Sequence, residues 1–389
     1  MTGSILVFWP VLLVCATDRS LQPATDVEID VKAAVLKAFG TPLSVEQVPD
    51  PVLGTGEVIV EVVAAPVLPY AREVFSGERR YMLDLPAIPG CAAIGRVLET
   101  GPDATRLNAG DWVLCDPTVR SRDGGLTPDI TLQGWSARGP GGMLLQRYFR
   151  DGPFAEQIRV PTENAVPIGQ IDAKDASAWC ALVTLLVPYG GLLAMDLKAG
   201  ETLLVSGATG NFGSAAVATA LAMGAGRLVA PGRNRNMLDD LVRRFGNRVR
   251  PVILTGDADV DLATMKAAAA GPIDAVLDLL PPEVSSRVVR TAVMTVRPYD
   301  RVVLMGGVGM LGGDDLALPY PWIMRNLVTI RGQWMHDPSA ITGMASLIHA
   351  GLLDLGQFDI VEFPLERVAD AVAHAAANPQ GFKLTVLRP

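Results

Sequence analysis

Apolar residues fall into successive patterns along this chain, and these patterns predict two kinds of folded unit. Over residues 31–168, short β-branched runs such as GEVIVEVVAAPV and GDWVLCDP are broken by Gly and Pro, as is typical of a strand-rich, irregular domain. Over residues 172–335, short apolar runs alternate with helical patterns, for example TLLVS before an Ala-rich stretch and PVILTG before DLATMKAAAAG. That alternation predicts a parallel sheet with helices on both faces. The remainder reads as helix, strand, helix and a final strand, KLTVLRP.

The first thirty residues form a separate N-terminal extension. The apolar run ILVFWPVLLVCA is about as long as the core of a signal peptide and too short to span a bilayer. A secretory signal with Val14 and Ala16 at the cleavage positions is one interpretation. We favour an extension that packs on the body, or an unnatural start site, because no Lys or Arg precedes the run and it contains Pro10.

Length and charge restrict the function. A chain of 389 residues is expected to form two domains. Its net charge is −8 and its basic residues are scattered, which argues against nucleic acid as a partner. The four cysteines stand far apart without a CxxC pair, so we expect neither a disulfide framework nor a zinc knuckle, and a reducing, cytoplasmic location.

A polar, Gly-rich segment interrupts the first domain at residues 116–153. It carries five arginines: Arg120, Arg122, Arg138, Arg147 and Arg150. We predict a long loop or lobe here. Segments of this length are usually lids, binding elements or interface arms.

A glycine cluster marks the candidate binding site. Gly207, Gly210 and Gly213 lie between a predicted strand ending at Ser206 and a helix predicted to start near Phe212. Glycine permits a tight turn, a close approach of a phosphate to the backbone and close packing of helix on strand. The start of the helix then faces the anion. The predicted dinucleotide contacts are Ala208, Thr209, Gly210, Asn211, Phe212 and Gly213, although the fingerprint is one glycine short of GxGxxG.

The segment after the second strand of this unit predicts the cofactor. An acidic residue about twenty positions past the glycines would favour NAD, but this chain has Gly232, Arg233, Asn234 and Arg235 there. Two guanidinium groups and no acid suit a 2′-phosphate, so we predict NADP(H). The alternative to a phosphate-binding role is that both arginines are simply solvated at the start of a helix. Further along, Gly306, Gly307 and Val308 follow the fifth strand, where their backbone could meet the nicotinamide amide.

With these residues in hand, the chain resembles the medium-chain dehydrogenase/reductase superfamily, and within it the zinc-free, quinone-oxidoreductase-like branch. The resemblance covers residues 31–389 and depends on the order and spacing of several segments: VKAAVLKAFG, GEVIVEVVAAPV, IPGCAAIGRVLETGPDATRLNAGDWV, GPFAEQIRVPTENAVPI, LKAGETLLVSGATGNFGSAA and GFKLTVLRP. It implies an α/β protein in which a GroES-like, β-rich substrate domain (31–171 and 338–389) surrounds a Rossmann doubly wound parallel-sheet domain (172–337). Relatives commonly dimerise through the edge of the Rossmann sheet, so we expect a homodimer.

The resemblance also concerns metal binding. Where zinc members have their three catalytic ligands, this chain has Leu68, Cys91 and Val183 or a neighbour. Zinc needs three protein ligands at such a site, and the four-cysteine zinc lobe is replaced by the Arg-rich segment. We therefore predict no metal.

Without a metal, polarisation of a substrate must come from hydrogen bonds. Tyr70 stands where alcohol dehydrogenases place a proton-relaying hydroxyl, which makes it our candidate for the acid or orienting donor. A core tyrosine with a satisfied hydroxyl is the alternative. Five further residues are expected to line the substrate pocket: Cys91, Trp135, Tyr148, Trp334 and His336. Cys91 could equally be a small packed residue.

Two functions from different classes remain. The favoured one is an NADPH-dependent oxidoreductase that transfers hydride to a quinone, enone or carbonyl compound, with an NADP-dependent alcohol dehydrogenase as its nearest variant. The other is a non-enzymatic, nucleotide-binding or scaffold protein on the same fold.

Overall fold

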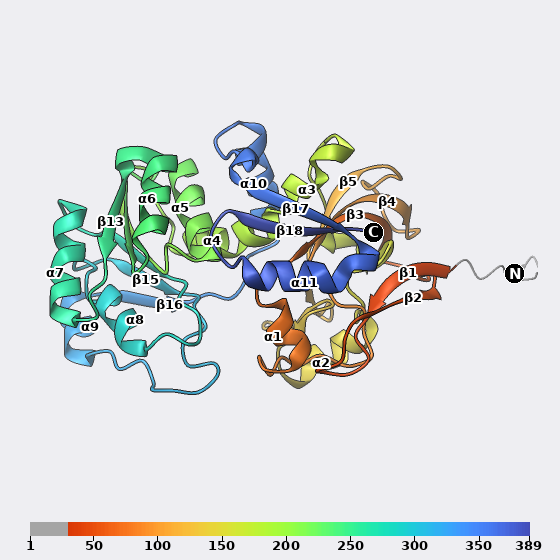
Figure 1. Ribbon diagram of the computed structural model, residues 1–389, viewed down its shortest axis with the longest axis horizontal. Coiled ribbons are helices and arrows are strands. Elements are labelled where there is room, and N and C mark those ends of the chain that lie inside the picture. Colours follow the sequence, from red (N-terminus) through yellow and green to blue (C-terminus); the bar gives the residue numbers. More distant parts are fainter. Residues whose placement is uncertain (1–29) are drawn as a thin grey trace, which may run out of the picture.

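The computed structural model describes residues 30–389, which form two bodies joined by a cluster of helices and strands (Figure 1). The N-terminal extension predicted for residues 1–30 lies outside the described residues, apart from Asp30. One body is built on a six-stranded sheet and the other on a seven-stranded sheet.

The six-stranded sheet is wholly parallel and doubly wound. Its strands in spatial order are β13 (Val249–Ile253), β12 (Arg227–Gly232), β11 (Thr202–Ser206), β14 (Ala275–Asp278), β15 (Arg301–Leu304) and β16 (Thr329–Gly332). The chain order reverses between β11 and β14. In sheets of this kind a ligand binds outside the carboxyl ends of the strands, at that reversal.

Both faces of this sheet are covered, which explains its nearly continuous apolar strands. Leu203 and Val205 of β11 belong to the large core of the molecule, whereas Leu204 between them belongs to a second core on the opposite face. The helices around the sheet are α4 (Leu182–Ala194), α5 (Asn211–Ala222), α6 (Arg235–Phe245), α7 (Ala258–Ala269), α8 (Ser286–Val293) and α9 (Tyr320–Asn326). Alternate side chains of each strand thus enter different cores.

The seven-stranded sheet brings together strands from widely separated parts of the chain. Its strands run in the order β10 (Ala165–Pro167), β5 (Trp112–Cys115), β4 (Ala93–Thr100), β3 (Glu57–Val67), β18 (Lys383–Arg388) and β17 (Asp359–Pro364), and β9 (Gln157–Pro161) also pairs with β3. A hairpin of β1 (Asp30–Val35) and β2 (Ser44–Pro49) lies beside it. The predicted fold class, a GroES-like β domain with a parallel α/β domain, is confirmed.

Short helices complete this second body. They are α1 (Ala71–Ser76), α3 (Ala176–Trp179), α10 (Ser339–His349) and α11 (Val368–Ala377). His349 on α10 has Nε2 2.7 Å from the carbonyl oxygen of Ile168, and His374 on α11 has Nδ1 2.9 Å from Thr385 Oγ1. His349 therefore links α10 to the residue after β10, and His374 links α11 to β18.

The Arg-rich segment is an ordered lobe. It contains the three-stranded sheet β6 (Thr118–Arg120), β7 (Ile130–Leu132) and β8 (Ser136–Ala137), followed by α2 (Gly139–Tyr148). Gly142 packs so closely on β7 that an added Cβ would overlap the carbonyl oxygen of Ile130. Gln146 is fully buried, and its Oε1 accepts from the backbone N–H of Asp84 at 2.9 Å. Gly142 therefore serves the packing of α2 on β7.

Among residues 30–389, no single helix has the length and apolar character needed to cross a bilayer, and one bent pair, Ala173–Trp179 with Leu182–Ala194, meets those criteria jointly.

Candidate active site

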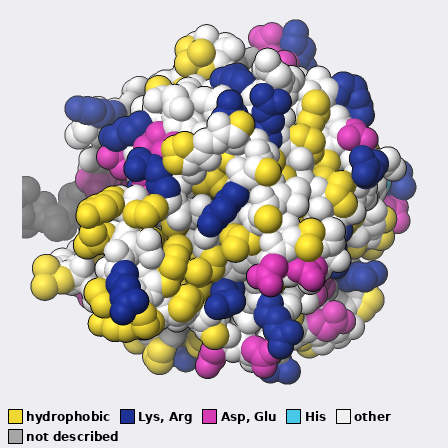
Figure 2. Space-filling view, turned by 90° about the vertical axis from the view of Figure 1, so that its left-hand side faces the viewer, with side chains coloured by type: hydrophobic (Ala, Val, Ile, Leu, Met, Phe, Trp, Pro, Cys, Tyr) yellow, Lys and Arg dark blue, Asp and Glu magenta, His cyan; other side chains and the backbone are white. Residues whose placement is uncertain are grey.

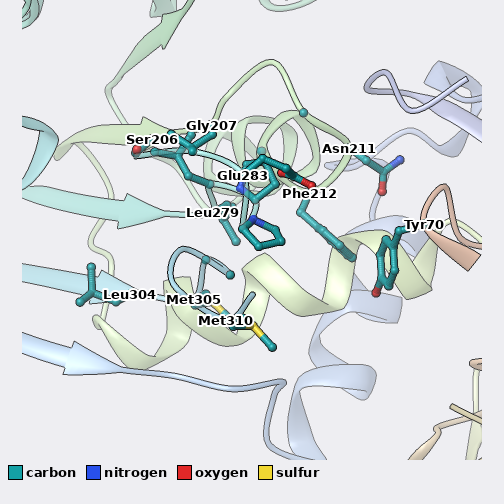
Figure 3. Close-up of a pocket in the computed structure, with 18 of the residues that line it drawn as sticks. Tyr70, Ser206, Gly207, Asn211, Phe212, Leu279, Glu283, Leu304, Met305 and Met310 are labelled. Atoms are coloured by element: carbon teal, nitrogen blue, oxygen red, sulfur yellow. The ribbon is translucent and has the colours of Figure 1, made fainter. Parts of the chain in front are cut away.

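A cavity of about 1940 Å³ lies at the carboxyl edge of the six-stranded sheet and extends to the β-rich body. Its lining includes the glycine turn after β11, the ends of β14 and β15, and Tyr70 at the start of α1. In Figure 3, Phe212 extends from the start of α5 toward Tyr70, with Ser206 and Gly207 at the far end and Met305 and Met310 below. The candidate dinucleotide turn and the candidate acid thus share one cavity.

The glycine turn is held in a conformation that other residues would not allow. Gly207 has φ +88°, in the left-handed region that favours glycine. A Cβ on Gly213 would overlap the carbonyl oxygen of Gly207. Helix α5 therefore begins close against the end of β11, and Gly207 and Gly210 in the turn between them carry no side chain that would shield their backbone.

The start of α5 offers free hydrogen-bond donors. Gly210 is the N-cap, and no side chain caps the helix. The N–H groups of Asn211, Phe212 and Gly213, in the first turn, have no intrahelical acceptors. Asn211 Oδ1 is also buried without a partner among residues 30–389. Together with the bare glycine turn, these donors suit the pyrophosphate of a dinucleotide.

A smaller hollow of about 530 Å³ adjoins the turn at the end of β12. It is lined by Thr209, Arg233, Asn234, Arg235 and Asn236. A Cβ on Gly232 would stand only 2.8 Å from Thr209 Cγ2, so an acidic side chain at position 232 could fit only if Thr209 moved. Within the described part of the chain the hollow has two guanidinium groups and no carboxylate in its lining.

Aromatic residues form the opposite end of the large cavity. Tyr70 and Trp135 meet edge to face with ring centroids 5.7 Å apart, and the Arg79 guanidinium lies 4.2 Å from the centre of the Tyr70 ring. Burial raises the pKa of Tyr70 well above its ordinary value. The phenol is therefore protonated at neutral pH and can donate a hydrogen bond or a proton.

The three positions matched to zinc ligands also meet in this cavity. Leu68, Cys91 and Val183 all line it, so two of the three positions carry hydrocarbon side chains. Burial, with a smaller effect of Asp116, raises the pKa of the Cys91 thiol far above its ordinary value, which opposes the thiolate that a metal would require. No group of three His, Cys, Asp or Glu side chains in residues 30–389 could hold a metal ion. The donor set does not fit zinc.

Two predicted pocket residues lie elsewhere. Tyr148, at the end of α2, is exposed, and its ring packs against Arg159 with the guanidinium 4.7 Å from the ring centre. His336 is only 3% exposed and directs Nε2 toward Asp116 Oδ1, 3.8 Å away. Neither lines the cavity. Tyr148 lies outside because α2 packs against β7, and His336 because it lies in the interior beside Asp116, so their predicted place in a substrate pocket stays a prediction.

The other predicted residues are divided between the cavity, the hollow and the core. The cavity is lined by Tyr70, Cys91, Trp135, Thr209, Gly210, Asn211, Phe212, Gly213, Gly232, Arg233, Gly306, Gly307 and Trp334. Asn234 and Arg235 line the hollow, and Asn234 also caps α6. Ala208 is fully buried below the turn and Val308 packs against the second core, so neither side chain faces the cavity.

Sequence reasoning missed several residues at the carboxyl edge of the sheet. Ser206, Leu279, Leu280 and Met305 line the cavity. Asp278 lies beneath them, where burial raises its pKa to about 6 despite hydrogen bonds from Ser206 and the backbone of Leu280. The rule that ligands bind at the carboxyl ends of parallel strands could have identified the ends of β14 and β15.

Comparisons with known proteins agree with this architecture. Residues 54–170 match the family described as alcohol dehydrogenase GroES-like domain. An alcohol dehydrogenase of Rhizobium meliloti (strain 1021) is 34% identical over 197 residues, and the acryloyl-coenzyme A reductase of Metallosphaera sedula is 32% identical over 196. These alignments cover 49% and 50% of this chain and 55% and 57% of the relatives, so the chain spans little more than half the length of the curated relatives it matches. A solved structure described as a zinc-binding dehydrogenase from Sinorhizobium meliloti 1021, bound to NADP, superposes with a TM-score of 0.75 at 19% identity, covering 92% of this chain and 99% of that one.

The fold and the comparisons together define the class: the chain has the fold of the medium-chain dehydrogenase/reductase superfamily. Within that class, it carries an alcohol dehydrogenase GroES-like domain. The matches do not single out the quinone-oxidoreductase-like branch that the sequence suggested, since the relatives include alcohol dehydrogenases.

Proposed function

We propose that this protein is an NADP(H)-dependent oxidoreductase that acts on a carbonyl compound without a metal. The observation that carries the proposal is the continuity of the cavity from the glycine turn to Tyr70. Such continuity would place a bound dinucleotide and a small substrate in contact. The named activities of the relatives, alcohol dehydrogenase and acryloyl-coenzyme A reductase, favour interconversion of an aldehyde or ketone with its alcohol, or reduction of a conjugated carbonyl, over quinone reduction.

The choice of NADP(H) over NAD(H) depends on the hollow after β12. Arg233 and Arg235 are exposed there and could bind a 2′-phosphate, and Thr209 crowds the space that an acidic side chain at position 232 would need. The related fold from Sinorhizobium meliloti that holds NADP supports this choice.

The chain's own groups account for the remaining chemistry. When bound, the cofactor supplies or accepts the hydride. Tyr70 would hydrogen-bond the carbonyl oxygen and deliver a proton to it as the alcohol forms, and would receive that proton in the reverse direction. Its raised pKa keeps the phenol protonated at neutral pH, so that it can donate a hydrogen bond to the carbonyl oxygen. Trp135 and Phe212 would exclude water beside it.

A homodimer is proposed on separate grounds. Strand β16 forms an edge of the six-stranded sheet, and α9 beside it exposes large apolar side chains. Tyr320 is 76% exposed, and Met324 and Leu327 are each 54% exposed. Figure 2 shows apolar side chains gathered on this end of the molecule. A second copy paired along β16 would cover them.

The function is tested by mixing purified protein with NADPH and a panel of aldehydes, ketones, enones and quinones, while absorbance of the reduced nicotinamide is followed. We expect turnover of at least one carbonyl class, and weaker binding of NADH than of NADPH in a fluorescence titration. Binding without turnover of any acceptor would favour the non-enzymatic alternative. Absence of binding to either dinucleotide would refute the proposal.

A further inference from the structure

The wall of the cavity opposite the dinucleotide turn is rich in guanidinium groups. Arg72, Arg79 and Arg80 come from α1 and the turn after it, and Arg138 comes from the junction of β8 and α2. Glu73 is the one acid that these segments contribute to the lining within residues 30–389. The remaining acids of the lining, Asp257, Asp259, Asp261 and Glu283, belong to the six-stranded body.

Most of this positive charge is uncompensated. Glu73 is occupied by Arg79, whose Nε lies 2.8 Å from its Oε2, and Arg79 also covers the Tyr70 ring. In the described part of the chain, Arg72, Arg80 and Arg138 form no ion pair. Arg138 donates to the carbonyl oxygen of Pro128 at 2.9 Å and lies 5.9 Å from the Trp334 ring. These three side chains are exposed and free to bind an anion.

The backbone at Arg80 adds a second observation. Arg80 has φ +53°, a left-handed conformation that non-glycine residues rarely adopt. Its N–H donates to the carbonyl oxygen of Gly77 at 3.1 Å, which fixes the turn after α1. Strained positions of this kind cluster at ligand-binding sites. Arg80 combines this backbone conformation with a place in the lining of the cavity.

The dinucleotide accounts for only part of the cavity. Its phosphates are matched by the start of α5 and by Arg233 on the other body. The cavity volume of about 1940 Å³ is also roughly twice the upper end of the range of about 300–1,000 Å³ that is usual for one small ligand. A second ligand therefore has room beside the arginines.

We propose that the substrate carries an anionic group, a carboxylate or a phosphate, held by Arg72, Arg80 and Arg138 while its carbonyl lies against Tyr70 and Trp135. This inference depends on the proposed function for the identity of the reacting end and names the substrate class. Guanidinium groups bind carboxylate and phosphate oxygens through paired, charge-assisted hydrogen bonds. The aromatic residues suit a planar or apolar reacting end.

Three aromatic aldehydes of similar size test the proposal: 4-carboxybenzaldehyde, 4-formylphenyl phosphate and the neutral methyl 4-formylbenzoate. Each is titrated calorimetrically into the full-length protein with and without saturating NADPH, and its turnover is measured in parallel. We expect at least one anionic aldehyde to bind about tenfold or more tightly than the ester at low salt. Whichever of the two anionic aldehydes binds more tightly shows whether the arginines recognise a carboxylate or a phosphate. The advantage should shrink as salt rises to a few tenths molar.

The variant Arg72→Gln/Arg80→Gln/Arg138→Gln should lose that advantage while retaining its circular dichroism spectrum. Arg106→Gln, an exposed arginine outside the cavity, is the matched control and should keep it. Equal binding of ester and anions by the wild type, or an advantage that survives the triple substitution, would overturn the proposal. So would an equal loss of NADPH affinity in the triple variant, because the arginines would then serve the cofactor. Failure of the wild type to bind NADPH, with the arginine-dependent advantage intact, would refute the proposed function and leave this inference standing.

Discussion

Tyr70 is the residue on which the proposed proton transfer depends. It lines the aromatic end of the cavity together with Tyr81, and burial raises the pKa of Tyr70. We predict that Tyr70→Phe lowers kcat/KM for carbonyl reduction by about a hundredfold or more and leaves the Kd for NADPH within about twofold. Stopped-flow rates and fluorescence titration check both values. Tyr148→Phe, outside the cavity, is the control and should change neither; an unaffected Tyr70→Phe enzyme would remove Tyr70 from the mechanism.

Arg233 determines the proposed preference for a 2′-phosphate. Replacing it with Asp puts a carboxylate in the hollow after β12, where it would repel the phosphate and could accept from ribose hydroxyls. We expect the ratio of kcat/KM values, NADPH over NADH, to fall by about tenfold to a hundredfold. Steady-state kinetics with both cofactors measure it. An unchanged ratio would show that Arg233 does not contact the phosphate.

Asp278 couples the stability of the site to pH. Its folded pKa of about 6 lies above the ordinary value of 3.8, so the folded state holds the proton more tightly than the unfolded state. The resulting stabilisation is complete below about pH 4 and is lost as pH rises through 6. Asp278→Asn cannot ionise. Its free energy of unfolding should therefore rise relative to that of the wild type, by up to about 3 kcal/mol, as the pH increases from 4 to 7.

Urea unfolding at several pH values checks this prediction, with the exposed Asp123→Asn as control. A difference between wild type and Asp278→Asn that does not change with pH would mean that folding does not shift the pKa of Asp278.

At the residue scale, local patterns predicted some positions and could not predict others. The glycines after β11 are visible because a tight strand-to-helix turn requires them at fixed spacing. The position of His336 depends on Asp116, far away in the chain, and that of Tyr148 on Arg159, which lies beyond the end of its helix. Nothing in the neighbouring residues signals those contacts. The same reason hid Arg72 and Arg80, whose importance depends on Arg138 lying on the same wall.

At the element scale, the junction of β11 and α5 is the part least able to accept change. An alanine at Gly213 would push α5 away from the Gly207 carbonyl and disturb the donors of the first turn. We predict that Gly213→Ala weakens NADPH binding by at least about tenfold and lowers the thermal midpoint by a few degrees. Gly271→Ala, at a site where a Cβ meets nothing within 4 Å, should alter neither. Calorimetric titration and thermal unfolding separate the two outcomes.

The elements of the parallel sheet were predicted more fully than those of the Arg-rich lobe. Strands β11 to β15 are bounded by turn residues and alternate with helices, so the apolar pattern and the order of the segments are enough to predict them. Helix α2 begins Gly-Pro-Gly-Gly, which locally favours a loop. It forms because Gly142 packs closely on β7 and Gln146 satisfies buried groups there. Tertiary contacts outweigh local preference in this segment.

At the scale of the whole molecule, the edge strand β16 and helix α9 predict self-association. We expect light scattering to give the mass of a dimer for the wild type. Met324→Arg would place a charge among the exposed apolar side chains of α9 and should give a monomer that still binds NADPH. Met310→Arg, which alters an exposed apolar residue before α9, is the comparison. A monomeric wild type would contradict the proposed homodimer.

The placement of β18 next to β3 has a consequence for how the protein is made. During synthesis, β3 emerges early, whereas its neighbour β18 emerges only after the whole parallel-sheet body. Domains generally fold as units during translation, so the later body can reach its native state on the ribosome first. Meanwhile the earlier one exposes an open sheet edge. On this order of events, the part of the protein that is made first is the last to complete its sheet.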